Sequence, residues 1–146
     1  MGRVNELDRE QIDRFLDEQV MGRLGCNDAE GTYVVPLIYA RHGQMLYVLT
    51  TEGRKIRAAR SNPAVCFEVD EYDRKTGSWT SVIVWGRYEE LHGDAKTEAI
   101  AALGRRHGTR RASSEAPVAE ERATVAFRIV IERATGRAVT RPAIFS

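Results

Sequence analysis

The sequence has few cysteines, almost no net charge and no long hydrophobic run. Two of the 146 residues are cysteine, and neither has another Cys or His nearby at metal-site spacing, so we expect both to be reduced, buried and small hydrophobic residues. The 22 Lys and Arg residues nearly balance the 21 Asp and Glu residues, which leaves a formal net charge of +1. A charge this small excludes a strong overall attraction to nucleic acid or to an anionic membrane.

The hydrophobic pattern excludes two further classes of protein. No apolar stretch approaches the roughly 20 residues that a membrane-spanning helix needs. The polar N-terminus also lacks the apolar core of a signal peptide. We therefore expect a cytoplasmic protein with no membrane partner and no nucleic-acid partner.

A chain of 146 residues has the length of one domain. It can bury about two thirds of its unfolded surface, which is enough for a core without a disulfide or a metal. We predict a single domain over residues 1–146, with an N-terminal helix within residues 1–20 and a C-terminal tail over residues 134–146.

The periodicity of apolar residues predicts a fold rich in strands. Leu7–Val20 and Asp94–His107 repeat apolar residues at helical spacing. A hairpin is predicted where Thr32–Tyr39 and Met45–Thr50 are joined by the turn 41–44. Sequential short strands with few helices favour a small antiparallel barrel over a doubly wound sheet. The remaining predicted elements are strands at 21–27, 64–70, 79–91 and 124–133, a helix cap at Gly108 and a loop over 110–121.

Hydroxyls, a glycine and cations gather where the second hairpin strand meets a short helix. Thr50 and Thr51 precede the glycine, and Arg54 and Lys55 follow it. The N-terminus of a helix attracts anions and disfavours cations, so a bound phosphate would relieve the conflict that the two cations create. The alternative is a solvated basic face that continues along the helix. The spacing differs from that of a nucleoside-triphosphate loop.

Two strand features have both a structural and a functional interpretation. Pro36 lies in mid-strand, where it cannot donate a ladder hydrogen bond, so it marks either an ordinary bulge or a place where a planar ligand meets main-chain groups. The strand 79–91 places Trp79 and Ser81 on one face and Val82 on the other. Because both faces are largely apolar, we expect burial on each side, in a barrel or at an interface. Trp79 is then a core residue or a ligand contact.

The sequence indicates no catalytic residue and no metal ligand. His42, His92 and His107 fall in predicted loops or at helix ends. Their spacing fits neither a metal site nor a catalytic triad.

Several motifs together resemble one known family. They are Val34–Tyr39, the Gly-Arg-Lys of 53–55, Asn62–Asp70 and the run from Trp79 to Gly86. The sequence resembles the pyridoxamine 5′-phosphate oxidase-like flavin-binding split-barrel superfamily. Within it, the nearest branch is that of the flavin-nucleotide-binding proteins related to nitroimidazole-resistance proteins. The resemblance covers roughly residues 3–133 and implies a mainly β fold, a six-stranded antiparallel split β-barrel with flanking helices.

The resemblance also implies a cofactor and a partner. FMN would occupy two equivalent clefts at the interface of a homodimer, with its phosphate at the strand-to-helix turn described above. The flavin ring would lie along the backbone of residues 36–38, with the start of the strand 79–91 on the neighbouring strand. The cofactor-binding residues implied in this way are Pro36, Leu37, Ile38, Thr50, Thr51, Arg54, Lys55, Trp79, Ser81 and Val82.

The function implied is that of a flavin-dependent oxidoreductase that acts on a small molecule, with NAD(P)H as a candidate electron donor. One alternative is a reductase that uses the deazaflavin F420 on the same barrel. Its longer anionic tail would need more cations, which Arg57 and Arg60 could supply. The other alternative is a non-catalytic protein that binds flavin or haem.

Overall fold

The computed structural model describes residues 3–107 and 124–141. The predicted cap at Gly108, the predicted loop over 110–121 and residues 142–146 of the predicted tail lie outside the described residues. The elements in chain order are β1 (Val4–Glu6), α1 (Arg9–Glu18), β2 (Met21–Asp28), β3 (Gly31–Ile38), β4 (Ala40–His42), β5 (Met45–Thr51), α2 (Arg54–Ser61), β6 (Ala64–Tyr72), β7 (Trp79–Leu91), α3 (Gly93–His107) and β8 (Thr124–Val139).

Helix α1 begins at a capping box. The Asp8 carboxylate accepts a hydrogen bond from the Gln11 backbone N–H at 2.8 Å, and the Gln11 side chain accepts one from the Asp8 N–H at 2.9 Å. The box satisfies N–H groups that the start of a helix leaves without partners. Ile12, Phe15 and Leu16 share one face and are buried. This confirms the amphipathic helix predicted within the first 20 residues.

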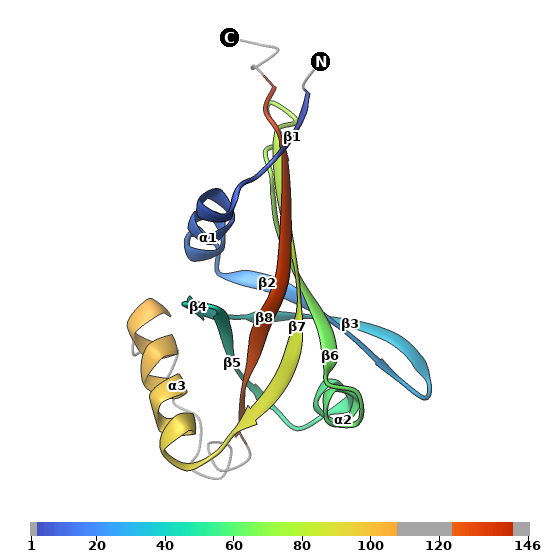
Figure 1. Ribbon diagram of the computed structural model, residues 1–146, viewed down its shortest axis with the longest axis vertical. Helices are drawn as coiled ribbons and strands as arrows, with labels where there is room; N and C mark the ends of the chain where they lie inside the picture. Colours follow the sequence, from blue (N-terminus) through green and yellow to red (C-terminus); the bar gives the residue numbers. More distant parts are fainter. Residues whose placement is uncertain (1–2, 108–123, 142–146) are drawn as a thin grey trace.

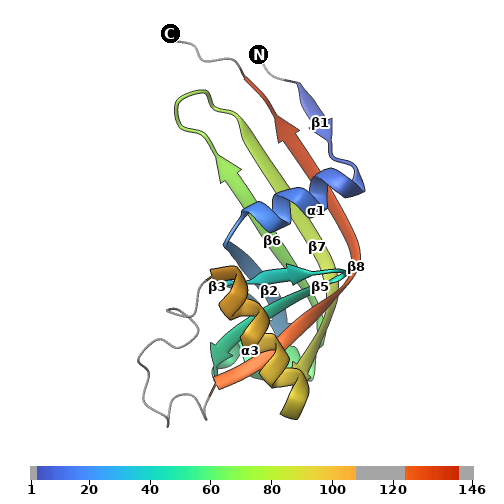
Figure 2. The same ribbon diagram turned by 90° about the vertical axis from the view of Figure 1, so that its left-hand side faces the viewer.

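The strands form one sheet in the order β3-β2-β6-β7-β8-β5-β4, and β1 pairs separately with β8. Every pairing is antiparallel. Strands β1 and β4 have three residues each, whereas β2, β3, β5, β6, β7 and β8 have at least seven. Helix α1 lies beside the second half of β8, and α3 lies beside β5 and the first half of β8 (Figures 1 and 2). The prediction of a mainly β, antiparallel fold with six principal strands and flanking helices is confirmed.

The prediction of a hairpin between 32–39 and 45–50 is wrong, because these two strands do not pair with each other. Strand β3 pairs along its whole length with β2, whereas β5 pairs with β4 and β8. Tyr39 separates β3 from β4, and its buried hydroxyl donates a hydrogen bond to the Leu16 carbonyl oxygen at 2.5 Å. The chain leaves one pairing before Tyr39 and begins the next after it, because this side chain points into the core beneath α1.

Strand β8 continues to Val139, beyond the predicted end at Arg133. Its second half pairs with the first half of β7 and with β1. Small residues at 134, 136 and 138 alternate with exposed polar ones there, so the hydrophobic alternation is too weak to predict a strand. A Cβ at Gly136 would lie 2.8 Å from the Leu7 side chain, so this glycine lets the segment before α1 approach the sheet closely.

The buried residues form two clusters. The larger joins the inner face of the sheet to α1 and α2 and includes Leu24, Phe67, Val82 and Phe127. The smaller lies under α3 and contains Leu91, Ala99 and Ala126, with Tyr47 and Leu49 packed against it. The two clusters lie on opposite faces of β5 and β8, because Leu46, Val48 and Phe127 belong to the larger one whereas the alternating residues Tyr47, Leu49 and Ala126 belong to the smaller. Helices α1 and α2 therefore cover the inner face of the sheet, and α3 covers the outer face of β5 and of the start of β8.

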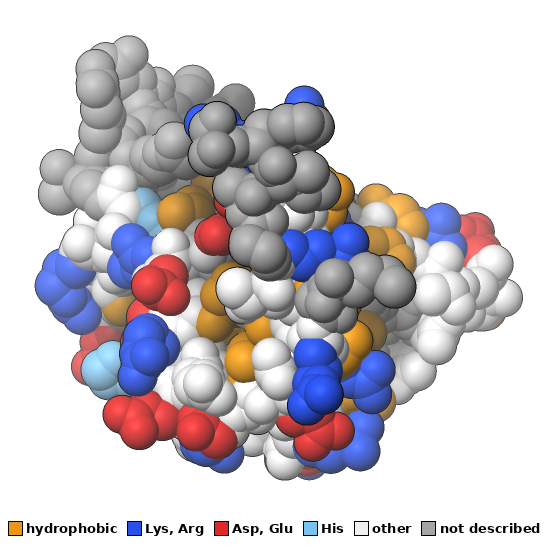
Figure 3. Space-filling view, turned by 90° about the horizontal axis from the view of Figure 1, so that it is seen from above, with side chains coloured by type: hydrophobic (Ala, Val, Ile, Leu, Met, Phe, Trp, Pro, Cys, Tyr) orange, Lys and Arg blue, Asp and Glu red, His pale blue; other side chains and the backbone are white. Residues whose placement is uncertain are grey.

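Charged side chains of both signs are interspersed around hydrophobic ones on the face that Figure 3 shows. This arrangement agrees with the small net charge of the chain. In the described part of the chain, no helix has both the length and the apolar character needed to cross a membrane.

Candidate functional site

The predicted phosphate site lies where β5 runs into α2. Gly53 is the N-cap of α2, its backbone is extended, and no side chain caps the helix. The first intrahelical bond runs from the Arg57 N–H to the Gly53 carbonyl oxygen at 3.1 Å. The N–H groups of the first turn therefore point away from the helix body toward the end of β5, where an anion could accept hydrogen bonds from them.

Lys55 lies over this helix start, and the two threonines precede it at the end of β5. The Lys55 ammonium lies 3.8 Å from the position that a Cβ would take at Gly53, so it folds back over the N-terminal turn. Thr50 is half-buried and Thr51 is exposed at the end of β5. The Lys55 side chain makes no hydrogen bond or ion pair with any residue that the structure describes. An uncapped helix start and an ammonium form a donor set that suits a phosphate monoester, which a threonine hydroxyl at the end of β5 would complete.

Arg54 is held by a carboxylate from a different part of the fold. Its Nε and Nη2 donate to Asp28 Oδ2 and Oδ1 at 3.2 and 3.4 Å, and its guanidinium lies 4.5 Å from the centre of the Tyr33 ring. The hydrogen bond with Arg54 holds the pKa of Asp28 below its usual value, so this carboxylate is ionised at neutral pH. Arg54 therefore lies at the start of α2 with one edge of its guanidinium already bonded to Asp28.

Arg60 is bonded to two carboxylates. It donates to Glu90 at 2.7 Å and to Glu52 at 2.5 Å. Two of the four cations of α2 are therefore neutralised by carboxylates, which partly resolves the conflict between these cations and the helix dipole without a ligand. Arg60 is also less available for the anionic tail of a deazaflavin.

The predicted ring-binding strand is an edge of the sheet. Strand β3 ends the strand order, so one of its backbone edges has no partner strand within the described residues. Pro36 is exposed, and Leu37 and Ile38 are half-buried. Pro36 has no N–H to donate, and its position on an edge strand is where proline is tolerated. The remaining main-chain groups of this edge are open to a ligand or to another chain.

The residues predicted on β7 do not lie on a strand next to β3. Strands β2 and β6 stand between them, so β3 and β7 are three strand spacings, about 14 Å, apart. Trp79 and Ser81 are half-buried on the outer face, and the Ser81 hydroxyl donates to Glu68 at 3.3 Å. The Val82 side chain is fully buried in the core and faces away from them.

Glu68 belongs to a charged group on this outer face. Arg23 donates to Glu68 at 3.1 Å and to Asp70 at 3.2 Å. Partial burial, with the nearby Asp70 carboxyl, raises the pKa of Glu68. Pro36 lies opposite Arg23, and Arg23 lies opposite Glu68, so this group links the β3 edge to Ser81 across the sheet. Glu68 and Asp70 are neighbours in the sequence, but Arg23, which bonds to both, is far from them along the chain.

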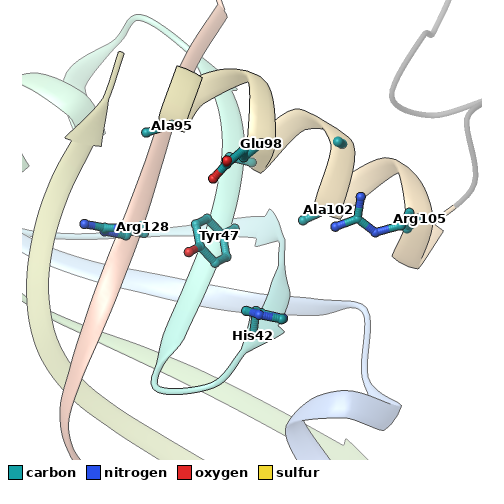
Figure 4. A pocket seen from close by; sticks show the side chains of 9 residues that line it. His42, Tyr47, Ala95, Glu98, Ala102, Arg105 and Arg128 are labelled. Atoms are coloured by element: carbon teal, nitrogen blue, oxygen red, sulfur yellow. The ribbon is translucent and has the colours of Figure 1, made fainter. Parts of the chain in front are cut away.

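A separate cavity of about 340 Å³ lies between α3 and the strands β5 and β8. The Tyr47 side chain lies between α3 and His42 (Figure 4). At its wall, Arg128 donates to Glu89 at 2.8 Å, which raises the pKa of Arg128. None of the ten predicted residues lines this cavity, and the only sequence signal for it is the row of alanines in α3. The lining residues are His42, Tyr47, Ala95, Glu98, Ala99, Ala101, Ala102, Arg105 and Arg128.

Comparisons with known proteins identify the family. The family model described as pyridoxamine 5′-phosphate oxidase matches residues 8–138. An uncharacterized protein of Rhizobium meliloti (strain 1021) is 36% identical over 88 residues, which are 60% of this chain and 58% of that protein. The chain thus matches little more than half the length of this curated relative.

Solved structures share the fold over nearly the whole chain. A FAD-binding protein of Mesorhizobium loti is 33% identical, with a TM-score of 0.79, over 94% of this chain and 99% of that one. A Bacteroides thetaiotaomicron protein, whose name links it to 5-nitroimidazole antibiotic resistance, is 19% identical, with a TM-score of 0.79, over 95% of this chain and 91% of that one. The chain therefore belongs to the pyridoxamine 5′-phosphate oxidase-like family of split-barrel proteins.

Proposed function

We propose that the protein binds FMN and serves as a flavin-dependent oxidoreductase of a small molecule. The observation that carries the proposal is the uncapped start of α2, where the Lys55 ammonium folds over free N–H groups beside Thr50 and Thr51. The Mesorhizobium loti relative, 33% identical, is named as a FAD-binding protein, which supports a flavin at this site. A bound flavin supplies the electron transfer itself, and the protein supplies binding and orientation.

Different residues of the chain would bind the phosphate and the ring of FMN. Lys55, the α2 N–H groups and the threonine hydroxyls bind the phosphate, and Arg54 adds the edge of its guanidinium that Asp28 leaves open. The open backbone edge of β3 at Pro36–Ile38 faces the flavin ring. These main-chain groups would orient the ring without a titratable side chain. No residue is therefore assigned as a catalytic acid or base.

We further propose that the site is completed by a second copy of the chain. The outer face of β7 carries Trp79, Ile83 and Trp85, all half-exposed. In one chain this strand is about 14 Å from β3, so β7 of a partner, brought against the β3 edge, would place these side chains at the flavin ring. Met21 and Val34, which are 54% and 60% exposed near the β3 edge, add apolar area to the outer face of β2 and β3.

Titration of the purified protein with FMN, followed by flavin fluorescence and by absorbance near about 450 nm, tests the flavin site. Lys55→Ala should raise the Kd for FMN by at least about tenfold, because it removes a charge-assisted bond to the phosphate. Arg57→Ala is the matched control, since Arg57 is an exposed cation of the same helix. A wild-type protein that binds neither FMN nor FAD would refute the proposal. Preference for F420 or haem would replace it with one of the alternatives.

Light scattering during size-exclusion chromatography tests the dimer. Ile83→Arg should convert a dimer to a monomer and lower FMN affinity at the same time, because it places a charge in the proposed interface. A monomeric wild-type protein that binds FMN, or a monomeric variant with unchanged affinity, would show that the flavin site is complete in one chain. NADPH and NADH oxidation by the loaded protein tests the oxidoreductase role.

A further inference from the structure

Asp28 joins two elements that the sequence keeps far apart. It is the last residue of β2, at the turn into β3, and both of its carboxylate oxygens accept hydrogen bonds from Arg54 at the start of α2. The two residues are 26 positions apart. Their side chains are 16% and 33% exposed, so the pair sits at the surface in reach of a ligand at the α2 N-terminus.

The Asp28 carboxylate is itself anchored to the backbone. Its Oδ1 accepts hydrogen bonds from the N–H groups of Glu30 and Gly31 at 2.8 and 3.1 Å. Gly31 has a φ of 125°, a conformation that glycine adopts far more readily than other residues, and this fixes the turn that places these N–H groups. The carboxylate therefore cannot follow Arg54 if that side chain moves.

The guanidinium of Arg54 is thus constrained on two sides. Its Nε and Nη2 edge is bonded to Asp28, and its face lies against the Tyr33 ring. Its Nη1 makes no hydrogen bond with any residue that the structure describes. A long side chain loses rotamer freedom when it binds a ligand, and a side chain that is already held loses less of it.

We propose that Asp28 is a positioning residue, which holds Arg54 so that its remaining donors face a phosphate bound at the start of α2. This inference rests on the proposed function, since it assumes a phosphate ligand there. Asp28 also carries a negative charge that repels phosphate, as does Glu30, whose carboxylate is 3.7 Å from Arg54 Nε. Positioning and repulsion predict opposite effects for the loss of Asp28, so one series of variants separates them.

The test measures the Kd values for FMN and riboflavin, which differ only in the phosphate. Asp28→Asn keeps an oxygen for the turn N–H groups but loses the bond to Nε, and Asp28→Ala loses both. We expect each variant to raise the Kd for FMN about tenfold and to leave that for riboflavin within about twofold. In an Arg54→Ala background, Asp28→Asn should leave the riboflavin value unchanged and should no longer raise the FMN value, because only the repulsion remains to be lost. Glu30→Gln, which removes a nearby charge but no hydrogen bond to Arg54, is the control.

Two results would overturn the positioning role. An unchanged or lower Kd for FMN in Asp28→Asn would show that repulsion equals or exceeds positioning. A similar loss of riboflavin binding would show a general disturbance of the fold, which the thermal melting of each variant also reports. A wild-type protein without flavin affinity would instead refute the proposed function, so the two failures are distinguishable.

Discussion

The closest backbone contact in the sheet gives the sharpest stability prediction. Strands β7 and β8 shift register between Trp85 and Gly86. A Cβ at Gly86 would lie 2.2 Å from the Val130 carbonyl oxygen and 2.7 Å from a methyl carbon of Ile129. Both strands are interior to the sheet, with neighbours on each side. A Gly86→Ala protein can therefore relieve the contact only by moving β7 and β8 apart.

The size of the effect follows from this geometry. Ordinary contacts of a Cβ begin beyond about 3 Å, so the strands must separate by roughly 1 Å, enough to lose one or two ladder hydrogen bonds worth about 1 kcal/mol each. Overpacking strain adds about 1–3 kcal/mol. We expect a total near about 3 kcal/mol, which in a domain of this size corresponds to a melting temperature about 10 °C lower.

Urea unfolding and thermal melting followed by circular dichroism measure this loss. Gly53→Ala is the matched control, because its backbone is extended and the nearest atom to the added Cβ is Lys55 Nζ at 3.8 Å. It should cost no more than about 1 kcal/mol, the difference between glycine and alanine at an N-cap. A Gly86→Ala protein that melts within about 2 °C of the wild type would refute the reasoning.

Two further predictions concern helix α1 and the Arg60 ion pairs. Asp8→Ala should lower the free energy of unfolding by about 1 kcal/mol, because it removes the carboxylate that accepts from the Gln11 N–H in the capping box; an unchanged urea midpoint would contradict this. The hydrogen bond from Arg60 lowers the pKa of Glu90 from 4.5 to about 2, so the stabilisation is complete above about pH 4.5 and is lost as the pH falls toward 2. Because solvent screens the half-exposed Arg60, we expect the unfolding free energy of the wild type to fall by only about 2 kcal/mol over this pH range. A Glu90→Gln protein should lack this part of the dependence of the unfolding free energy on pH. An equal pH dependence in the two proteins would contradict a stabilising role for the Arg60–Glu90 ion pair.

The elements around the proposed phosphate site were predictable because their signals are local. Thr50 to Lys55 are contiguous, and a strand followed by a glycine and a short helix ending before Pro63 brings their backbones together whatever the rest of the fold does. The structure places β5 and α2 at these residues. Helix α1 was predictable for the same reason, because its cap and its apolar face lie within one short segment of the sequence.

Strand pairing was less predictable, because alternation indicates which face of a strand is buried and not which strand lies beside it. Strand β3 has a polar turn on each side, at 27–31 and at 41–44, and either could join it to a neighbouring strand. The Asp28 carboxylate fixes the first turn by accepting the N–H groups of Glu30 and Gly31. The buried Tyr39 hydroxyl ends β3 before the second turn. Neither interaction leaves a periodic signal.

The wrong hairpin and the unforeseen partner of Arg54 have one cause. A prediction that pairs β3 with β5 gives no reason to place the turn at Asp28 beside the start of α2. Because β3 instead folds back on β2, Asp28 reaches the start of α2 and bonds the guanidinium there. The prediction of a phosphate site used charges that are adjacent in sequence. How strongly that site holds a phosphate depends on a carboxylate that only the β2–β3 pairing brings to it.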